Sequence, residues 1–361
     1  MRLNFYARAA ATLLLALAAA ELCVWLATPI PWMIGPLLAT AIASIGGAPT
    51  ASAGPLRNAG QWVIGAALGL YFTPQVTALV AGLWWAIVVA IVWALLLGTG
   101  FGLWLQRVHA PRMPELRGEA LRATTYYAGA IGAASEMTLL AERKGARADL
   151  VAAAHSMRLL IVVLVIPFAM QWGKAAWGLQ AIEFSPPGPK TAQWPGFLWL
   201  ALATGAGALL MDRLGRANPW FMGALLVAMG FTMAGINLTA IPTWLSNAAQ
   251  LVIGVSLGVR FSAEFVHTAP RWLASVALGT VVMIVLCAGL AGLLARGTGL
   301  PLATMILGVS PGGISEMAIT AKVLQLGVPV VTAFQVCRLV AVLLLVDPLY
   351  RWVYRVRAQR G

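Results

Sequence analysis

Long apolar runs, separated by short stretches that contain Gly, Pro or charged residues, follow one another along the whole chain. Most of them are close to the roughly 17–25 residues that an α-helix needs to cross the hydrocarbon core of a membrane. The pattern therefore predicts an all-α polytopic membrane protein. The twelve expected segments are 10–27, 31–46, 57–72, 79–104, 119–142, 148–170, 194–211, 219–236, 244–261, 272–294, 301–322 and 329–350.

The composition also indicates that the solvent of this chain is lipid rather than water. Hydrophobic residues make up 61% of the chain and charged residues only 10%, against about 45–50% and about 25% in soluble domains. The formal net charge is +13, and an excess of Lys and Arg in a membrane protein marks its cytoplasmic loops. A nucleic-acid-binding surface needs a polar, basic module, and no stretch is long and polar enough to form one. The expected partner is the lipid bilayer, with no direct contact to nucleic acid.

The two halves of the chain repeat each other. The matching blocks are Pro31–Leu38 with Pro219–Leu226, Asn58–Phe72 with Asn247–Phe261, Gly132–Met137 with Gly312–Met317, and Arg158–Leu159 with Arg338–Leu339. The blocks occur in the same order, which indicates an internal duplication, and duplicated membrane halves are the usual build of secondary transporters. The expected domains are a first membrane repeat at 1–173, a linker at 174–193 and a second membrane repeat at 194–361.

The fifth segment of each half is interrupted, at Ala128–Gly132 and at Ser310–Gly313. Each flank has about ten residues, half a crossing, so the segment is either a re-entrant hairpin or a broken spanning helix. If all twelve segments cross, the Lys and Arg residues of loops and tails divide 13 inside to 8 outside, and if both interrupted segments are re-entrant they divide 17 to 4. The positive-inside rule favours the second arrangement. It predicts two inverted repeats, each of about five transmembrane helices plus one re-entrant or broken helix, in the inner (plasma) membrane with both termini cytoplasmic.

The interruptions are followed by residues that can carry chemistry. Irregular backbone at membrane depth is tolerated where protein or a water-filled cavity satisfies its polar groups. A Ser-Glu pair then stands at the start of a half-helix, where backbone N–H groups point at a ligand, although the same pair is also good capping chemistry. Because the motif occurs twice, we expect one substrate or ion site near the membrane midplane. Its expected residues are Gly132, Ser135, Glu136, Pro311, Gly312, Gly313, Ser315 and Glu316.

Arg158 and Arg338 belong to the same expected site. They lie near the middle of their apolar runs, where a charge is costly and points to function. Two interpretations stay open: contact with an anionic substrate, or a structural ion pair with Glu136 or Glu316. Other intramembrane polar residues are expected as a secondary lining, with interhelical hydrogen bonding as the alternative. They are Asn58, Gln61, His155, Asn247, Gln250 and Gln335.

Two glycine pairs, Gly65–Gly69 and Gly254–Gly258, have the small-xxx-small spacing of close helix crossings. Glycine has no side chain, so two backbones can approach each other there. We expect each pair to mark a tight helix contact.

Motifs of enzymatic chemistry are missing from the sequence. The three Cys and three His residues are scattered, without the spacing of a disulfide framework or a metal site. The chain has no GxxxxGKS/T, GxSxG or HExxH motif, so neither ATP hydrolysis nor nucleophilic or metal-dependent catalysis is indicated. We therefore expect no enzyme, no metal and no cofactor.

The duplicated PW-x-x-G-x-LL and G-x-x-SEM blocks, each followed by an intramembrane Arg, resemble the AbrB-duplication membrane family over nearly the whole chain. Members of that family are described as regulators of gene expression or as ammonia monooxygenases, and a more general view groups them with secondary transporters. Three scattered His residues speak against a copper monooxygenase, and without a DNA-reading surface a regulatory role would be indirect. The first half has Ala130–Ile131 where the second has Ser310–Pro311, so the two sites need not be equivalent.

The sequence thus favours a secondary transporter of a small solute, coupled to H⁺ or Na⁺, because inverted repeats supply the two interchangeable halves that alternating access requires. The solute is expected to be an anion if the nearby Glu residues do not neutralise Arg158 and Arg338. The alternative is a membrane-bound regulator or sensor of gene expression that acts indirectly through a bound metabolite. The cytoplasmic segments expected here, about a dozen residues at most, are short for the output domain of a sensor. Assembly into a homodimer is left open.

Overall fold

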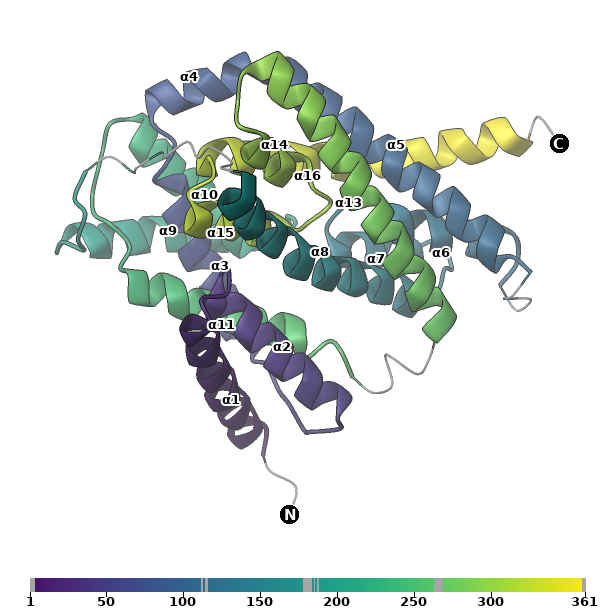
Figure 1. The fold of residues 1–361 in the computed structure, drawn as a ribbon, viewed down its shortest axis with the longest axis horizontal. Helices are drawn as coiled ribbons and strands as arrows, with labels where there is room; N and C mark the ends of the chain where they lie inside the picture. The colour runs from purple at the N-terminus through teal and green to yellow at the C-terminus, as the bar shows by residue number, and fades with distance from the viewer. Residues whose placement is uncertain are drawn as a thin grey trace. The chain divides into compact units, whose positions relative to one another are not determined.

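The computed structural model describes residues 4–111, 113, 116–177, 184, 186, 188–262 and 269–358. Every regular element in these residues is an α-helix (Figure 1), which confirms the expected all-α class. The helices of the first half are α1 Phe5–Trp25, α2 Pro31–Ile45, α3 Gly54–Gly69, α4 Pro74–Gly82, α5 Trp84–His109, α6 Gly118–Gly129, α7 Ala134–Glu142 and α8 Ala148–Trp177. Those of the second half are α9 Gly196–Arg213, α10 Pro219–Met233, α11 Thr243–Gly258, α13 Pro270–Thr298, α14 Leu302–Val309, α15 Ile314–Leu324 and α16 Val328–Ala358.

Both interruptions occur where the sequence predicts them. Residues 130–133 separate α6 from α7, and residues 310–313 separate α14 from α15. In the second break Pro311 lacks a backbone N–H, so it cannot continue the hydrogen-bond ladder of α14. The breaks lie at equivalent positions of the two halves, with the same number of residues in each.

The fourth expected segment, 79–104, is different in the structure. A separate helix, α4, precedes α5, and α3 and α4 meet at an angle of 90°. Pro74 begins α4, and the Thr73 hydroxyl accepts a hydrogen bond from the Val76 N–H at 3.2 Å. Threonine followed by proline is a helix-start signal, and it lies between the expected segments 57–72 and 79–104. The difference from the expectation is the break at Leu83, which divides 79–104 between α4 and α5.

Several helices are long and apolar enough to cross a membrane. By length and composition they are Phe5–Trp25, Trp84–His109, Ala148–Gly173, Pro270–Thr298 and Val328–Tyr354, with a sixth if α3 and α4 count as one span. Shorter apolar helices are Pro31–Ile45 and Pro219–Met233. These helices make the chain a multi-pass membrane protein. The expected ten crossings, the inverted repeats and the cytoplasmic termini stay predictions.

The chain packs into two compact units, each built from three segments. Unit 1 consists of Met1–Gly82, Val163–Thr268 and Ser315–Thr332, and unit 2 of Leu83–Val162, Ala269–Ile314 and Ala333–Gly361. Each unit therefore contains helices from both halves of the sequence. The expected division into repeats with a linker at 174–193 stays a prediction about the sequence. Helix α8 continues to Trp177, and residues 178–183, 185 and 187 of that linker lie outside the described residues.

In unit 1, α2 packs against α11 at the second glycine pair. A Cβ atom added to Gly254 would lie 2.6 Å from the carbonyl oxygen of Met33, and one added to Gly258 would lie 2.7 Å from that of Leu37. Any side chain at these positions would force the two backbones apart. The expected tight contact is confirmed.

The first glycine pair makes the corresponding contact between α3 and α10. Cβ atoms on Gly65 and Gly69 would overlap the carbonyl oxygens of Phe221 and Leu225. Phe221 and Leu225 match Met33 and Leu37 in the duplicated blocks. The Pro-Trp block of each half thus packs on the glycine helix of the other half.

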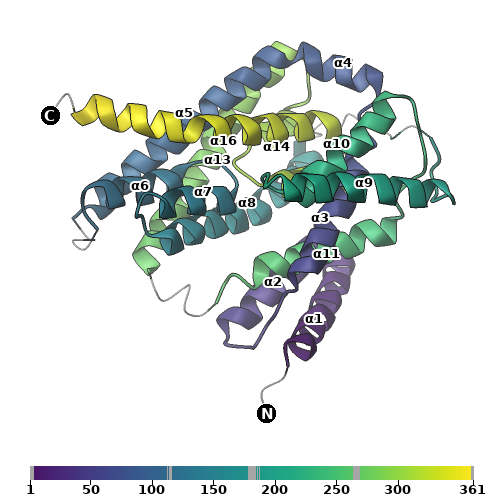
Figure 2. The same ribbon diagram turned by 180° about the vertical axis from the view of Figure 1, so that it is seen from behind.

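In unit 2, α5 packs against α6, and α13 packs against both α5 and α14 (Figures 1 and 2). The Tyr126 hydroxyl donates to the carbonyl of Val346 at 2.9 Å, which ties α6 to α16. The Trp272 indole N–H donates to the carbonyl of Leu150 at 3.1 Å, which ties α13 to α8. These contacts fix the helices that carry the candidate site.

Candidate functional site

Arg158, on α8, holds the end of the first interrupted helix. Its guanidinium donates to the carbonyls of Ala128 at 3.4 Å, Gly129 at 3.3 Å and Ala130 at 2.8 Å. These are the last carbonyls of α6, which have no partner within the helix. The side chain is 4% exposed, so the arginine supplies hydrogen bonds that water does not.

His155, one turn before Arg158, completes this arrangement. The Arg158 Nη2 lies 2.6 Å from His155 Nδ1, and His155 Nε2 lies 3.0 Å from the carbonyl oxygen of Tyr127. A guanidinium can only donate, so Nδ1 accepts the hydrogen bond and the ring proton resides on Nε2. His155 is therefore assigned as the neutral Nε2–H tautomer, bonded at both nitrogens.

Arg338, on α16, holds the end of the second interrupted helix. It donates to the carbonyls of Ser310 and of Gly312, the latter at 2.7 Å, and to the side-chain oxygen of Gln335 at 2.6 Å. The Gln335 amide N–H in turn donates to the carbonyl of Leu307 at 2.7 Å. Arg338 is 5% exposed and Gln335 is fully buried.

The two arrangements correspond residue for residue. Each arginine donates to the carbonyl of the residue 28 positions before it: Arg158 to Ala130 and Arg338 to Ser310. The residue three positions before each arginine also contacts a carbonyl 28 positions before itself: His155 that of Tyr127 and Gln335 that of Leu307. A cation at a helix C-terminus is stabilised by the helix dipole, whose negative end is there. Both arginines thus cap half-helices, with His155 in the first half standing where Gln335 stands in the second.

The break residues themselves are packed differently in the two halves. Pro311 and Gly312 are buried and Gly313 is half-buried. Gly132 is half-buried, and a Cβ there would lie 2.9 Å from the Cε of Met137. The second break is therefore the more enclosed of the two.

Unit 2 holds two buried cations, Arg158 and Arg338, whose charges are not offset by an ion pair with any described carboxylate of the unit. Arg158 and Arg338 are close enough for their positive charges to repel each other. Among the described residues of unit 2, no carboxylate forms an ion pair with either of them, since the recorded ion pairs there join Arg147 to Asp149 and Arg351 to Asp347. The Nε of Arg338 is buried and has no hydrogen-bond partner. Buried charges are normally paired, so this is an unusual arrangement.

The two Ser-Glu pairs have different surroundings. Ser315 and Glu316, at the start of α15, are each 5% exposed, and the Glu316 charge interacts with that of Arg260. Ser135 is exposed and Glu136 half-buried at the start of α7. Ser135 and Glu136 belong to unit 2, whereas Ser315 and Glu316 belong to unit 1. Their expected meeting in one site stays a prediction.

The polar residues of the expected secondary lining divide between the two units. His155 and Gln335 lie in unit 2, each bonded to an arginine. Unit 1 holds the four amide residues, of which Gln250 is buried and the others half-buried: Asn58, Gln61, Asn247 and Gln250. The amides lie on α3 and α11, which pack against each other.

Sequence reasoning expected carboxylates or a substrate as the partners of the arginines and did not find the carbonyls. Backbone acceptors are present at every residue, so no sequence pattern marks them. One signal was available, because the distance from each interruption to its arginine is the same in both halves. That constancy fits a fixed contact between the arginine and the break.

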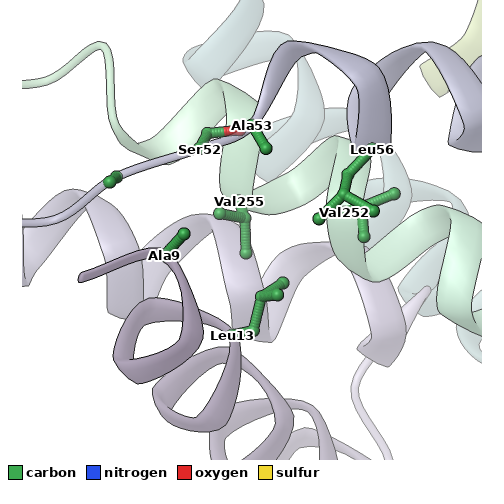
Figure 3. Close-up of a pocket in the computed structure, with 8 residues that line it drawn as sticks. Ala9, Leu13, Ser52, Ala53, Leu56, Val252 and Val255 are labelled. Carbon is green, nitrogen blue, oxygen red and sulfur yellow. The ribbon is translucent and has the colours of Figure 1, made fainter. Parts of the chain in front are cut away.

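A small pocket in unit 1 has a different character (Figure 3). Figure 3 shows Ala9 and Leu13 of α1, Leu56 of α3, and Val252 and Val255 of α11 around it. It has room for about one water molecule, and no charged side chain lines it. It does not contribute to the candidate site. In the part of the chain that the structure describes, no three His, Cys, Asp or Glu side chains gather as metal ligands.

Comparisons with known proteins identify the family of this chain. The family described as transition state regulatory protein AbrB matches residues 32–354. The chain is similar to the uncharacterized protein YhjN of Bacillus subtilis (strain 168), with 27% identity over 315 residues that cover 83% of this chain and 79% of that protein. It is also similar to the candidate regulator AbrB of Escherichia coli (strain K12), with 28% identity over 333 residues that cover 90% of each chain. Because the family match spans most of the sequence, the chain belongs to the AbrB family.

Proposed function

We propose that this protein is a secondary transporter of a small anionic solute, coupled to H⁺ or Na⁺, and not an enzyme. Interrupted helices at membrane depth are a common way to build the substrate and ion sites of such transporters. Two of them occur here, at equivalent places in the duplicated sequence. The proposal therefore begins from the breaks and the side chains that hold them.

The observation that carries the proposal is the pair of buried arginines in unit 2. Each half-helix C-terminus supplies roughly half a negative elementary charge, so the two ends together offset about one of the two positive charges. In the described residues of unit 2 no ion-paired carboxylate offsets the remainder. A small anion bound beside the arginines would do so, because Arg recognises carboxylates and other oxyanions well.

The Ser-Glu pairs are the proposed seats of the coupling ion. Both stand in the first turn of a half-helix, where hydroxyl and carboxylate oxygens can receive H⁺ or Na⁺. Glu316 is the better candidate for binding the ion because it is buried, whereas Glu136 is half-buried. A carboxylate enclosed by protein has more to gain from a bound cation than one in contact with solvent.

Transport can be tested in proteoliposomes with radiolabelled acetate, pyruvate, succinate and glutamate. We expect the parent protein to move at least one of them, and both Glu136→Gln and Glu316→Gln to lower the uptake. Unchanged uptake in both variants would make the carboxylates structural caps while leaving the transporter class intact. A parent protein that moves no solute from a broad panel would overturn the proposed function.

The alternative function is a membrane-bound regulator or sensor that acts indirectly through a bound metabolite. The family description and the name of the Escherichia coli relative both refer to regulation. A sensor would use the same residues to bind a solute but would not carry it across. Tight binding of a carboxylate by the purified protein, without any uptake in proteoliposomes, would favour this alternative.

The proposed membrane topology has its own test. Two inverted repeats with five crossings each would place residue 180 outside the cytoplasm and the C-terminus inside the cytoplasm of the cell. Reporter fusions at these two positions are expected to report opposite sides of the inner membrane. Reporters on the same side would refute the odd number of crossings.

A further inference from the structure

We propose that His155 binds the coupling proton together with the anionic solute, so that the protein carries both in the same direction. The inference rests on the proposed function, which leaves the choice between H⁺ and Na⁺ open; it specifies H⁺ and adds Nδ1 of His155 to the Ser-Glu pairs as a proton-binding atom. It is carried by the contacts of His155, Arg158 and Tyr127 and by the difference between the two halves at this position.

The starting point is the hydrogen bond between Arg158 and His155. Nη2 and Nδ1 are 2.6 Å apart, and Nδ1 is the accepting atom. A proton arriving from water would bind at Nδ1, since Nε2 already carries a proton bonded to the carbonyl of Tyr127 at 3.0 Å. Arg158 would then lose its acceptor, and two positive charges would face each other inside a buried site.

An anion removes this conflict. A carboxylate oxygen placed beside Nη2 and a protonated Nδ1 would accept a hydrogen bond from each and would offset the added charge. The proton and the anion therefore favour each other's binding, and by thermodynamic linkage the effect is reciprocal. Protonation also frees an Arg158 N–H that is otherwise engaged, so the donor needed for the solute becomes available when the proton binds.

The second half of the chain lacks this possibility. Gln335 occupies the equivalent position and bonds Arg338 through its side-chain oxygen at 2.6 Å. An amide does not take up a proton in the physiological range, whereas histidine does. The two halves thus keep the same structural contact, and only the first can titrate.

Other charged groups do not replace the anion. Arg338 on α16 repels Arg158 and so adds to the positive charge of the site. On α6 the carbonyl of Tyr127 faces His155, while the phenol of Tyr127 donates to Asp347 at 3.0 Å. The charge that acts on His155 within the described part of unit 2 is that of Arg158.

The test compares His155→Gln with the parent and with His109→Gln, a matched control that removes another buried imidazole of unit 2. Gln at position 155 reproduces the arrangement of Gln335, so the contacts to Arg158 and Tyr127 are kept. Uptake of radiolabelled acetate, pyruvate, succinate and glutamate into proteoliposomes is measured with and without an inward proton gradient. The readout is the ratio of the two uptakes, which does not depend on the absolute rate.

We expect the parent and His109→Gln to show a ratio of about ten or more, and His155→Gln a ratio near one. A His155→Gln ratio equal to that of the parent would overturn the inference and leave the proposed function standing. Uptake of a carboxylate by the parent protein that is driven by a sodium gradient but not by a proton gradient would also overturn the inference and leave the proposed function standing. A parent that moves none of the carboxylates would overturn the proposed function and this inference with it.

A spectroscopic measurement on the parent covers the case in which His155→Gln does not fold. The chain has three histidines, so a nitrogen NMR spectrum of histidine-labelled protein contains few imidazole signals. Addition of a transported carboxylate is expected to move the signals of one imidazole, distinct from that of His109, from the neutral to the charged position. Signals that stay neutral at saturating carboxylate would overturn the inference.

Discussion

The break after α6 and the break after α14 are built on the same plan with different neighbours. In both, an arginine from the following long helix donates to the carbonyl of the residue that ends a half-helix, Ala130 or Ser310. In the first break the arginine donates a hydrogen bond to His155, and in the second to Gln335. The arginine contact is common to both breaks because any helix that ends within the membrane needs hydrogen-bond partners for its last carbonyls. The residue beside the arginine, His155 in one half and Gln335 in the other, is where the two halves can differ in function.

Removal of the arginines should have the largest effect. Arg338→Leu leaves the carbonyls of Ser310 and Gly312 and the oxygen of Gln335 without their donor, and each buried orphan costs about 1–3 kcal/mol. We expect a loss of about 3 kcal/mol or more in the free energy of unfolding, and a similar loss for Arg158→Leu. Thermal unfolding in detergent measures it. Arg213→Leu, at the exposed end of α9, should change little, and an equally small change in the arginine variants would show that the caps are not structural.

A second variant, Gln335→His, places in the second break the residue that stands beside the arginine in the first. Gln335→His should keep one bond to a carbonyl and the bond to Arg338, at a cost of about 1–2 kcal/mol. Acidification from roughly pH 8 to pH 5 should then lower its unfolding temperature more than that of the parent, since an imidazolium would lose its acceptor role beside a guanidinium. The same pH series on both proteins checks this. Identical pH profiles would mean that the surroundings of position 335 do not resemble those of His155.

The tyrosines of α6 have no counterpart in α14, so their removal should affect only the first break. Tyr127→Phe removes the hydrogen bond to Asp347 at 3.0 Å, and we expect a loss of about 1 kcal/mol. The unfolding temperature should fall by less than in the arginine variants. Tyr6→Phe, at a side chain that is 80% exposed, serves as the control. A loss equal to that of Arg158→Leu would show that the tyrosine contributes as much as the arginine at this end of α6.

The smallest effect is expected from Gly132→Ala. The added methyl group would meet the end of the Met137 side chain at 2.9 Å, and a methionine can move aside. We expect a change below about 1 kcal/mol in the free energy of unfolding. A much larger loss, measured by thermal unfolding, would mean that the first break is as tightly packed as the second.

The helices and the two breaks were predictable because their causes are visible in the sequence. Apolar runs define the helices, and Pro311 with its neighbouring glycines defines the second break almost to the residue. The glycine pairs predicted close helix contacts, and the structure has backbone carbonyls at both of them. The boundary between α4 and α5 was missed because residues 79–104 form one apolar run, without a proline or a charge at Leu83 to mark the end of a helix.

The hydrogen-bond partners of Arg158 and Arg338 could not be predicted from the sequence. A buried arginine suggests a carboxylate or a ligand, since those are the partners that carry charge. Free carbonyls exist only once a helix has ended, and they depend on the arrangement in space rather than on residue type. The asymmetry between His155 and Gln335 was visible in the sequence, but its meaning required the contact of each with an arginine.

The central claim is that the arginines of the two breaks bind a solute, and its most direct test is exchange of radiolabelled carboxylates across proteoliposomes. Parent, Arg158→Gln, Arg338→Gln and the exposed control Arg213→Gln are compared at equal amounts of monodisperse protein. We expect parent and Arg213→Gln to exchange a carboxylate at the same rate, and both buried variants to fall by about tenfold or more. Exchange at the parental rate by folded Arg158→Gln and Arg338→Gln would contradict the account.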